Sequence, residues 1–129
     1  MASPTKKLTV LVADDHPTNL RAAVRILQAL GHGGVIVKDG EQALAALNKQ
    51  SFDLVMLDVV MPGLDGVGVL RSIRQSKTSA PAHLPVLMVT GADSPDEREA
   101  LRQQGAQGVL GKPISEDQVR AALVQLRLM

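Results

Sequence analysis

Five polar residues stand where short apolar runs of this sequence end, and their types are those of an ion or phosphate site. They are Asp14, Asp15, Asp58, Thr90 and Lys112. If the runs are neighbouring parallel strands, their carboxyl ends meet at one edge of a sheet, where the ligands of such folds bind. Three carboxylates in one crevice repel one another, so either one of them is protonated or a cation lies between them.

The chemistry of this set is that of phosphoryl transfer. Two or three carboxylates with water favour a hard cation, and they suit Mg2+ better than Ca2+. Lys112 adds a positive charge and Thr90 adds a hydroxyl group at the same edge. A cation, a lysine and a hydroxyl around one carboxylate stabilise a phosphoryl group in transfer. The carboxylate nearest to them can attack phosphorus and form an acyl phosphate.

Each of these residues also has an ordinary structural role. Aspartate pairs are common in solvated turns, an aspartate or a threonine can simply end a strand, and a Lys-Pro pair suits a surface turn. Four separate strand ends carry the residue type that the chemistry needs, however, and this coincidence favours the functional interpretation.

The elements that would position these residues alternate strictly along the chain. Five runs rich in Val, Leu and Met are mostly apolar at consecutive positions, which predicts strands covered on both faces of a parallel sheet. They span residues 8–13, 35–38, 53–57, 86–90 and 109–110.

The stretches between these runs carry apolar residues at helical spacing, and four of them form clear stripes. The stripes are Leu20, Ala23, Val24, Leu27 and Leu30; Ala43, Leu44 and Leu47; Val67, Leu70 and Ile73; and Val119, Ala122, Leu123 and Leu126. Strict alternation of strand and helix predicts an α/β fold with one doubly wound, five-stranded parallel sheet. A further helix, over residues 95–104, leaves only Ala100 and Leu101 to pack, so we expect it to be the most mobile helix.

Length and composition limit the classes of function. The 129 residues, of which 45% are hydrophobic and 21% charged, predict one folded domain over residues 1–129. A net charge of +1 and a single aromatic residue, Phe52, give no reason to expect nucleic acid or a membrane as a direct partner. Without cysteine, a signal peptide or a span-length apolar segment, the expected compartment is the cytoplasm.

The histidines and glycines give weaker signals. His16, beside the aspartate pair, either lines the crevice or lies at the entry to the first helix, and the second role is favoured. His32 and His83 have no metal-ligand spacing, so both are expected on the solvated surface. The glycines form neither a dinucleotide fingerprint nor a P-loop.

Four motifs resemble those of the receiver domain of bacterial two-component response regulators. They are V-A-D-D at residues 12–15, L-D-V-V-M-P-G-L-D-G at 57–66, V-T-G at 89–91 and G-K-P at 111–113. The resemblance covers about residues 7–126, which would form the core of the domain. It implies a flavodoxin-like (βα)5 fold with the strand order 2-1-3-4-5.

The resemblance also implies a role for each matching residue. Asp58 would be the phosphorylated aspartate, Asp15 a direct Mg2+ ligand, and Asp14 a partner acting partly through water. The backbone carbonyl of Val60 would complete the protein ligands, and Mn2+ is a possible substitute for Mg2+. Lys112 would contact the phosphoryl oxygens. The remaining implied features are movement of Thr90 toward the phosphoryl group, an open approach at Gly91, and a cis peptide bond before Pro113.

One position departs from the family pattern. Many members have Tyr or Phe three residues before the lysine, where this sequence has Val109. A switch built on Thr90 and an inward-swinging aromatic ring therefore cannot operate. Instead, the loop after Thr90 and the polar helix over residues 95–104 would carry the change.

The resemblance implies a phosphoacceptor in a phosphorelay rather than a metabolic enzyme. The donor would be the phosphohistidine of a sensor histidine kinase or phosphotransfer domain, and an unknown downstream protein would bind the face formed by the last strand and last two helices.

Asn19 fits receivers of hybrid kinases, so the chain is either a stand-alone regulator or part of a longer protein. A monomer or a phosphorylation-dependent dimer is expected. The alternatives are a pseudo-receiver that only binds partners and a Mg2+-dependent aspartyl phosphohydrolase.

Overall fold

The structure is a computed structural model, and it describes residues 7–129. Strands and helices alternate along this part of the chain. In order they are β1 (Thr9–Ala13), α1 (Pro17–Ala29), β2 (Gly33–Val37), α2 (Gly40–Lys49), β3 (Leu54–Asp58), α3 (Gly66–Arg74), β4 (Val86–Thr90), α4 (Pro95–Gln103), β5 (Gly108–Gly111) and α5 (Glu116–Gln125).

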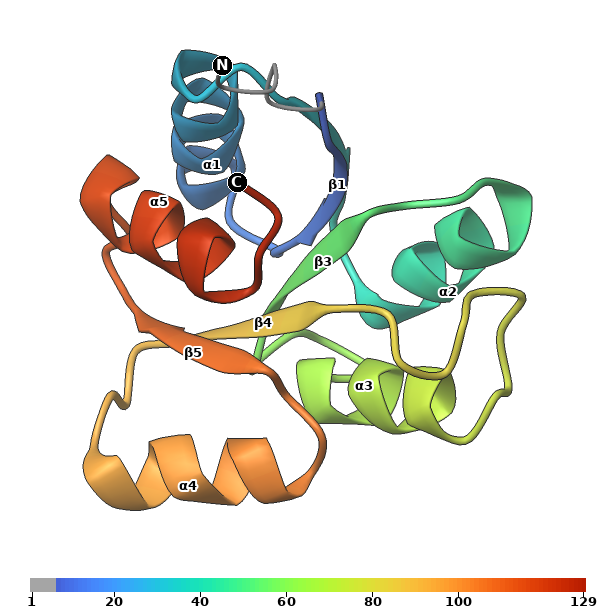
Figure 1. Cartoon of the computed structure of the whole chain (residues 1–129). Helices are drawn as coiled ribbons and strands as arrows, with labels where there is room; N and C mark the ends of the chain where they lie inside the picture. The colour runs from blue at the N-terminus through green and yellow to red at the C-terminus, as the bar shows by residue number, and fades with distance from the viewer. Residues whose placement is uncertain (1–6) are drawn as a thin grey trace.

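The strands form one parallel sheet in the order β2-β1-β3-β4-β5. Helices α1 and α5 lie over one face of the sheet, and α2 and α3 lie over the other (Figure 1). This architecture confirms the predicted doubly wound α/β fold and its strand order. The order reverses between β1 and β3, so the carboxyl ends of these two strands flank the switch point at which such folds bind ligands.

Two apolar cores hold the layers together. Val10 and Val12 of β1 pack with α1 and α5, whereas Leu11 and Ala13 pack with α2 and α3. Strands β3 and β4 are buried at every position, as a strand covered on both faces should be. The same prediction is wrong for β2, one of the two edge strands, in which Ile36 is 48% exposed.

His32 corrects the sequence analysis, which expected it on the solvated surface. Its side chain is 3% exposed, and its Nδ1 accepts a hydrogen bond from the backbone N–H of Leu8 at 3.0 Å. Burial lowers the pKa of His32 below its ordinary value, with the nearby charge of Asp53 acting in the opposite direction. His32 is thus a structural residue joining the start of β1 to the turn before β2, whereas His83 is exposed as expected.

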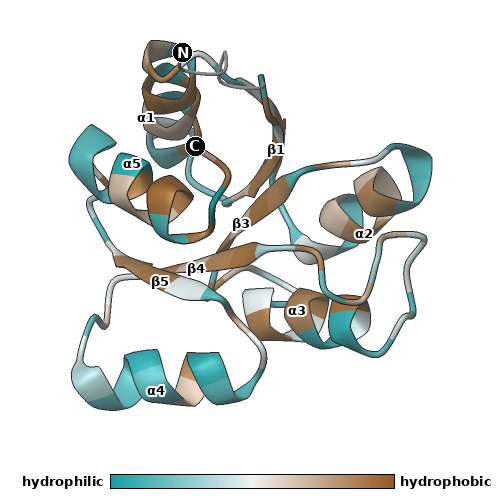
Figure 2. Cartoon of the chain, viewed as in Figure 1, coloured by the Kyte–Doolittle hydropathy of each residue, from teal (hydrophilic) through white to brown (hydrophobic). Residues whose placement is uncertain are grey.

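Helix α4 is the most polar helix of the described chain, which Figure 2 shows by its teal colour. Leu101 is its only buried residue, whereas Ala100 is exposed and does not pack as expected. Arg98 makes a contact that sequence analysis did not foresee, because its Nη1 donates to the carbonyl of Val109 in β5 at 2.8 Å. Arg98 also pairs with Asp93 in the preceding loop, so polar contacts hold α4 together with the single buried Leu101.

Arg74, at the end of α3, holds two loops at the amino ends of β4 and β5. They are the loop before β4 and the loop between α4 and β5. Its guanidinium donates to the carbonyls of Gly105, Ala82 and Leu84 and to the side chain of Gln107, over distances of 2.6 to 2.9 Å. We expect Arg74→Met to lower the free energy of unfolding by about 2–4 kcal/mol, because four hydrogen bonds from a half-buried cation are lost together. Urea denaturation would measure this change.

Arg71→Met on the same helix is the matched control for this prediction. Arg71 is exposed, and its side chain donates to the exposed Gln104. A surface substitution of this kind should change stability by less than about 0.5 kcal/mol. Equal losses in the two variants would show that Arg74 contributes only as an ordinary surface residue.

Candidate functional site

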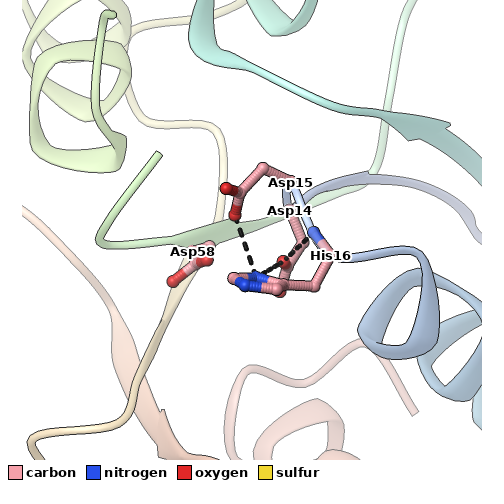
Figure 3. A group of neighbouring side chains, drawn as sticks. All are labelled: Asp14, Asp15, His16 and Asp58. Atoms are coloured by element: carbon pink, nitrogen blue, oxygen red, sulfur yellow. Dashed lines mark hydrogen bonds and ion pairs between the residues drawn. The ribbon is translucent and has the colours of Figure 1, made fainter. Parts of the chain in front are cut away.

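The aspartates that the sequence singles out converge at the carboxyl edge of the sheet. Asp14 and Asp15 follow β1, Asp58 ends β3, and these strands are hydrogen-bonded neighbours with Ala13 beside Leu57. One ligand atom from each aspartate and one from His16 lie within 4.8 Å of one another (Figure 3). The predicted crevice of three carboxylates is therefore present.

Lys112 supplies the positive charge of this crevice. Its Nζ lies 2.9 Å from Asp58 Oδ1 and 3.6 Å from Asp14 Oδ2. The backbone places it there, because Lys112 directly follows β5 and its N–H donates to the carbonyl of Thr90 in β4 at 2.8 Å. One lysine thus bridges two of the three carboxylates, which leaves the group with excess negative charge.

Asp58 is the most enclosed of the three carboxylates. It is 3% exposed, and its Oδ1 accepts a second hydrogen bond from the backbone N–H of Val60 at 3.3 Å. Its Oδ2 is buried and has no hydrogen-bond partner within residues 7–129. A buried anionic oxygen without a partner is costly, and a bound cation is one way to offset that cost. The residues present therefore fit a hard divalent cation with oxygen ligands.

The environment of Asp58 changes its acidity. Burial raises the pKa of Asp58 above its ordinary value, the hydrogen bond from Lys112 opposes that rise, and the negative charge of Asp14 adds to it. Because burial dominates, the carboxylate form of Asp58 is destabilised when no cation is bound.

A stability measurement follows from this electrostatic imbalance. In buffer with a chelator, we expect Asp58→Asn to raise the free energy of unfolding at pH 7 by about 1 kcal/mol, or roughly 4 °C in Tm. A raised folded-state pKa means that the folded state binds more protons, so wild-type stability falls as pH rises through that pKa. The advantage of the variant should therefore grow between about pH 4 and pH 7. A variant that is less stable at every pH would contradict this interpretation.

Thr90 and Gly91 lie at the rim of the site. Thr90 is buried, and its Oγ1 accepts a hydrogen bond from the backbone N–H of Ala92 at 3.0 Å, so the hydroxyl holds the loop after β4. Gly91 is exposed, and a Cβ at this position would meet nothing within 4 Å. The structure thus brings Thr90 to the correct edge, with its oxygen engaged by the loop.

The other expected site residues are also placed. Val60 is 75% exposed beside Asp58, and the peptide bond between Lys112 and Pro113 is cis. Val109 is 4% exposed and packs in the same core as Leu101. Its short, buried side chain therefore cannot replace the aromatic switch residue, which moves between two positions at the surface.

Two further residues shape the site: sequence analysis favoured the plainer role for His16 and did not foresee the contact of Gly66. His16 occupies the N-cap position of α1, as expected for a helix entry, but its ring Nδ1 also lies 3.0 Å from Asp15 Oδ1 and 3.3 Å from Asp14 Oδ1. Gly66 begins α3 against the backbone of Asp58, where a Cβ would lie 2.2 Å from the Asp58 carbonyl oxygen. His16 is adjacent to the aspartates, and Gly66 closes the 57–66 motif, so both signals were available.

A small cavity adjoins the site on the side of α1. It has a volume of about 60 Å³, and its polar lining comes from Asp14, Asn19, Asp58 and Lys112. The rest of the lining is mostly apolar, from α1, the strands and the loop before α5.

The family of the chain follows from comparison with known proteins. The model of the family described as the response regulator receiver domain matches residues 10–124. The chain belongs to this family. Receiver domains are signalling domains of two-component systems and are not metabolic enzymes.

Curated relatives of this receiver domain are much longer proteins. It is 38% identical to the sensor histidine kinase GacS of Pseudomonas protegens over 117 residues, which cover 90% of the chain and 13% of GacS. It is 37% identical to the sensor protein EvgS of Escherichia coli K12 over 121 residues, which cover 94% of the chain and 10% of EvgS. The chain therefore corresponds to a small part of these hybrid sensor kinases.

A solved structure with the same fold is the receiver domain of the sensor histidine kinase PA1611 from Pseudomonas aeruginosa. The TM-score is 0.82 and the identity 27%, and the match covers 93% of this chain and 97% of that one. That structure has a magnesium ion coordinated in its active-site cleft. In the present receiver domain, no described helix has the length and apolar character needed to cross a membrane.

Proposed function

We propose that this receiver domain accepts a phosphoryl group on Asp58, with the phosphohistidine of a sensor kinase or phosphotransfer domain as donor. One observation carries the proposal: Asp58 Oδ2 is buried without a hydrogen-bond partner in the described chain, while Lys112 and Val60 hold Oδ1. A carboxylate with one oxygen fixed and the other free is oriented for nucleophilic attack.

In the proposed reaction, Asp58 Oδ2 forms a bond to phosphorus while the phosphorus–nitrogen bond of the donor breaks. The electron pair of that bond stays on the donor's imidazole, which takes up a proton. Lys112 Nζ contacts the phosphoryl oxygens, and the Thr90 hydroxyl turns toward them as well. Asp14, Asp15, Asp58 and the Val60 carbonyl would hold Mg2+, or Mn2+ in its place, which supplies positive charge against the carboxylates and the phosphoryl group.

The output would pass through the loop after β4. If the Thr90 hydroxyl turns toward a phosphoryl group, the hydrogen bond that it accepts from the Ala92 N–H would rearrange, which would loosen the loop that carries Asp93. Asp93 binds Arg98, the residue that joins α4 to β5, so α4 would shift without an aromatic switch residue.

We expect phosphorylation to change backbone amide chemical shifts in α4 more than in α2. Fixed α4 shifts in a fully phosphorylated sample would contradict this route.

The surface that changes would be the face of α4, β5 and α5. A groove of about 390 Å³ runs there between Arg98 and Arg102 on α4 and Gln118 and Gln125 on α5. We propose that the downstream protein binds this face, or that a second copy does so in a phosphorylation-dependent dimer.

We also propose a single domain over residues 1–129 that works in the cytoplasm and contacts no nucleic acid or membrane directly. Residues 1–6 lie outside the described part of this domain.

Intact mass spectrometry tests the proposal. The protein is incubated with acetyl phosphate, with and without Mg2+, beside an Asp58→Asn variant. We expect one phosphoryl adduct of about 80 Da that needs Mg2+ and is absent in the variant. Folded protein without any adduct would support a pseudo-receiver, and steady release of phosphate from many small phosphate esters would support a phosphohydrolase.

A further inference from the structure

We infer that His16 is an additional metal ligand, which gives this acidic site a preference for borderline divalent cations such as Ni2+, Co2+ and Zn2+ over Mg2+. The inference rests on the proposed function, because it concerns the same site, but it adds a nitrogen ligand to the oxygen ligands considered so far. The observations that support it are the position of the His16 ring, the spacing of the ligand atoms and the unpartnered oxygens around them.

The ring of His16 lies against the aspartate pair, although its side chain is 65% exposed (Figure 3). Its Nδ1 is 3.0 Å from Asp15 Oδ1 and 3.3 Å from Asp14 Oδ1. The backbone fixes this position from two sides, since the His16 N–H donates to Asp14 Oδ1 at 2.9 Å and Pro17 follows as the first residue of α1.

These separations match those between ligands of one octahedral ion. Neighbouring ligands at bonds of about 2.1 Å lie about 3.0 Å apart, and opposite ligands lie about 4.2 Å apart. The nitrogen–oxygen distances of 3.0 and 3.3 Å correspond to neighbouring positions. One ligand atom from each of the four residues lies within 4.8 Å of the others, so Asp58 reaches the remaining position with a small adjustment.

Two oxygens of the group have no hydrogen bond that would explain their placement. Asp15 Oδ1 is buried and lacks a hydrogen-bond partner among the described residues. Its contact with His16 Nδ1 is an ion pair, whereas the hydrogen bond of that ring nitrogen is with Asp14 Oδ1. Asp58 Oδ2 is likewise unpartnered, in a side chain that is 3% exposed. A cation bound to the ring nitrogen and to Asp15 Oδ1 would satisfy that oxygen, and its charge would stabilise the nearby Asp58 carboxylate.

The nitrogen ligand changes which cation is favoured. Mg2+ prefers oxygen ligands, whereas imidazole suits Ni2+, Zn2+ and related ions, which bind mixed nitrogen and oxygen sites more tightly than earlier divalent metals do. Loss of the His16 ring should therefore weaken Ni2+ binding and leave Mg2+ binding nearly unchanged.

Calorimetric titration of protein without a histidine tag tests this selectivity. MgCl2 and NiCl2 are titrated into the wild type, His16→Phe and the control His83→Phe, which removes an exposed histidine outside the group. We expect His16→Phe to weaken Ni2+ binding by roughly 10- to 100-fold, the range that loss of even a supporting residue costs at metal sites. Mg2+ affinity should stay within about twofold, and His83→Phe should match the wild type.

A second readout identifies the ligand directly. With Co2+ bound, the remaining ring N–H of a coordinated His16 gives a strongly shifted proton signal that disappears in D2O and is absent in His16→Phe. Unchanged Ni2+ affinity in that variant, or tighter binding of both ions, would overturn the inference; the second result would mean that His16 competes with the cation. In either case Mg2+ binding by the wild type leaves the proposed function intact, whereas failure to bind Mg2+ at all counts against both.

Discussion

Replacing Lys112 with methionine is expected to slow phosphorylation of Asp58 by acetyl phosphate by roughly 100- to 1000-fold, the usual cost of losing one group that stabilises charge in a transition state. Lys112 Nζ lies 2.9 Å from Asp58 Oδ1 and 3.6 Å from Asp14 Oδ2. Without it, no side-chain cation of the site faces the buried Asp58 carboxylate, and the incoming phosphoryl oxygens lose their contact. Methionine keeps the length and most of the apolar stem, so the fold should persist.

Lys49→Met is the control for this experiment. Lys49 is exposed at the end of α2, away from the site, and its variant should react at the wild-type rate. The rates are measured by the growth of the phosphoryl adduct under saturating Mg2+, and far-ultraviolet circular dichroism verifies that both variants are folded. If Lys112→Met reacted as fast as Lys49→Met, the charge of Lys112 would have no role in transfer.

Gly66→Ala is expected to destabilise the domain by about 3 kcal/mol and to impair phosphorylation at the same time. The new methyl group would lie 2.2 Å from the carbonyl oxygen and 3.0 Å from the carbonyl carbon of Asp58. The clashing atoms belong to the backbone, so α3 must move away or the end of β3 must shift. Either movement also disturbs the hydrogen bond from the Gly66 N–H to the Val59 carbonyl, which is 3.1 Å long.

Gly91→Ala separates this steric effect from the general cost of replacing a glycine near the site. A Cβ at Gly91 would meet nothing within 4 Å, so its urea midpoint should stay close to that of the wild type. A Gly66→Ala protein as stable as Gly91→Ala would show that the contact between α3 and Asp58 is loose. The comparison thus measures how tightly the first turn of α3 fixes the phosphoacceptor.

The framework and the position of the acidic site are the features that the sequence predicts best. Strand and helix periods differ clearly, and parallel strands end at a common edge, so spacing predicted that Asp14, Asp15 and Asp58 lie at that edge. The strand order that makes the first and third strands neighbours came from the resemblance to receiver domains. Periodicity cannot show which strand becomes a sheet edge, and for this reason the exposure of Ile36 was not foreseen. The burial of His32 depends on a contact with Leu8, 24 residues away, which no local pattern reports.

Contacts of single side chains were also beyond the sequence. Arg98 looked like one more charge on a polar helix, yet it binds the Val109 carbonyl across to β5. Ala100 looked like a packing residue because it is apolar, but the rotation of α4 turns only Leu101 inward. His16 is next to the aspartates in sequence, but only the three-dimensional structure shows that its ring lies over both carboxylates.

Chemical mapping of the phosphoryl group tests the central claim most directly. An acyl phosphate on aspartate is reduced by borohydride to homoserine, which is stable to proteolysis and mass spectrometry. After reaction with acetyl phosphate and Mg2+, we predict that the peptide containing Asp58 carries this change and that the peptide containing Asp14 and Asp15 does not. Reduction at Asp14 or Asp15 instead, or at no aspartate in protein that has gained a phosphoryl mass, would contradict the assignment of Asp58 as the phosphoacceptor.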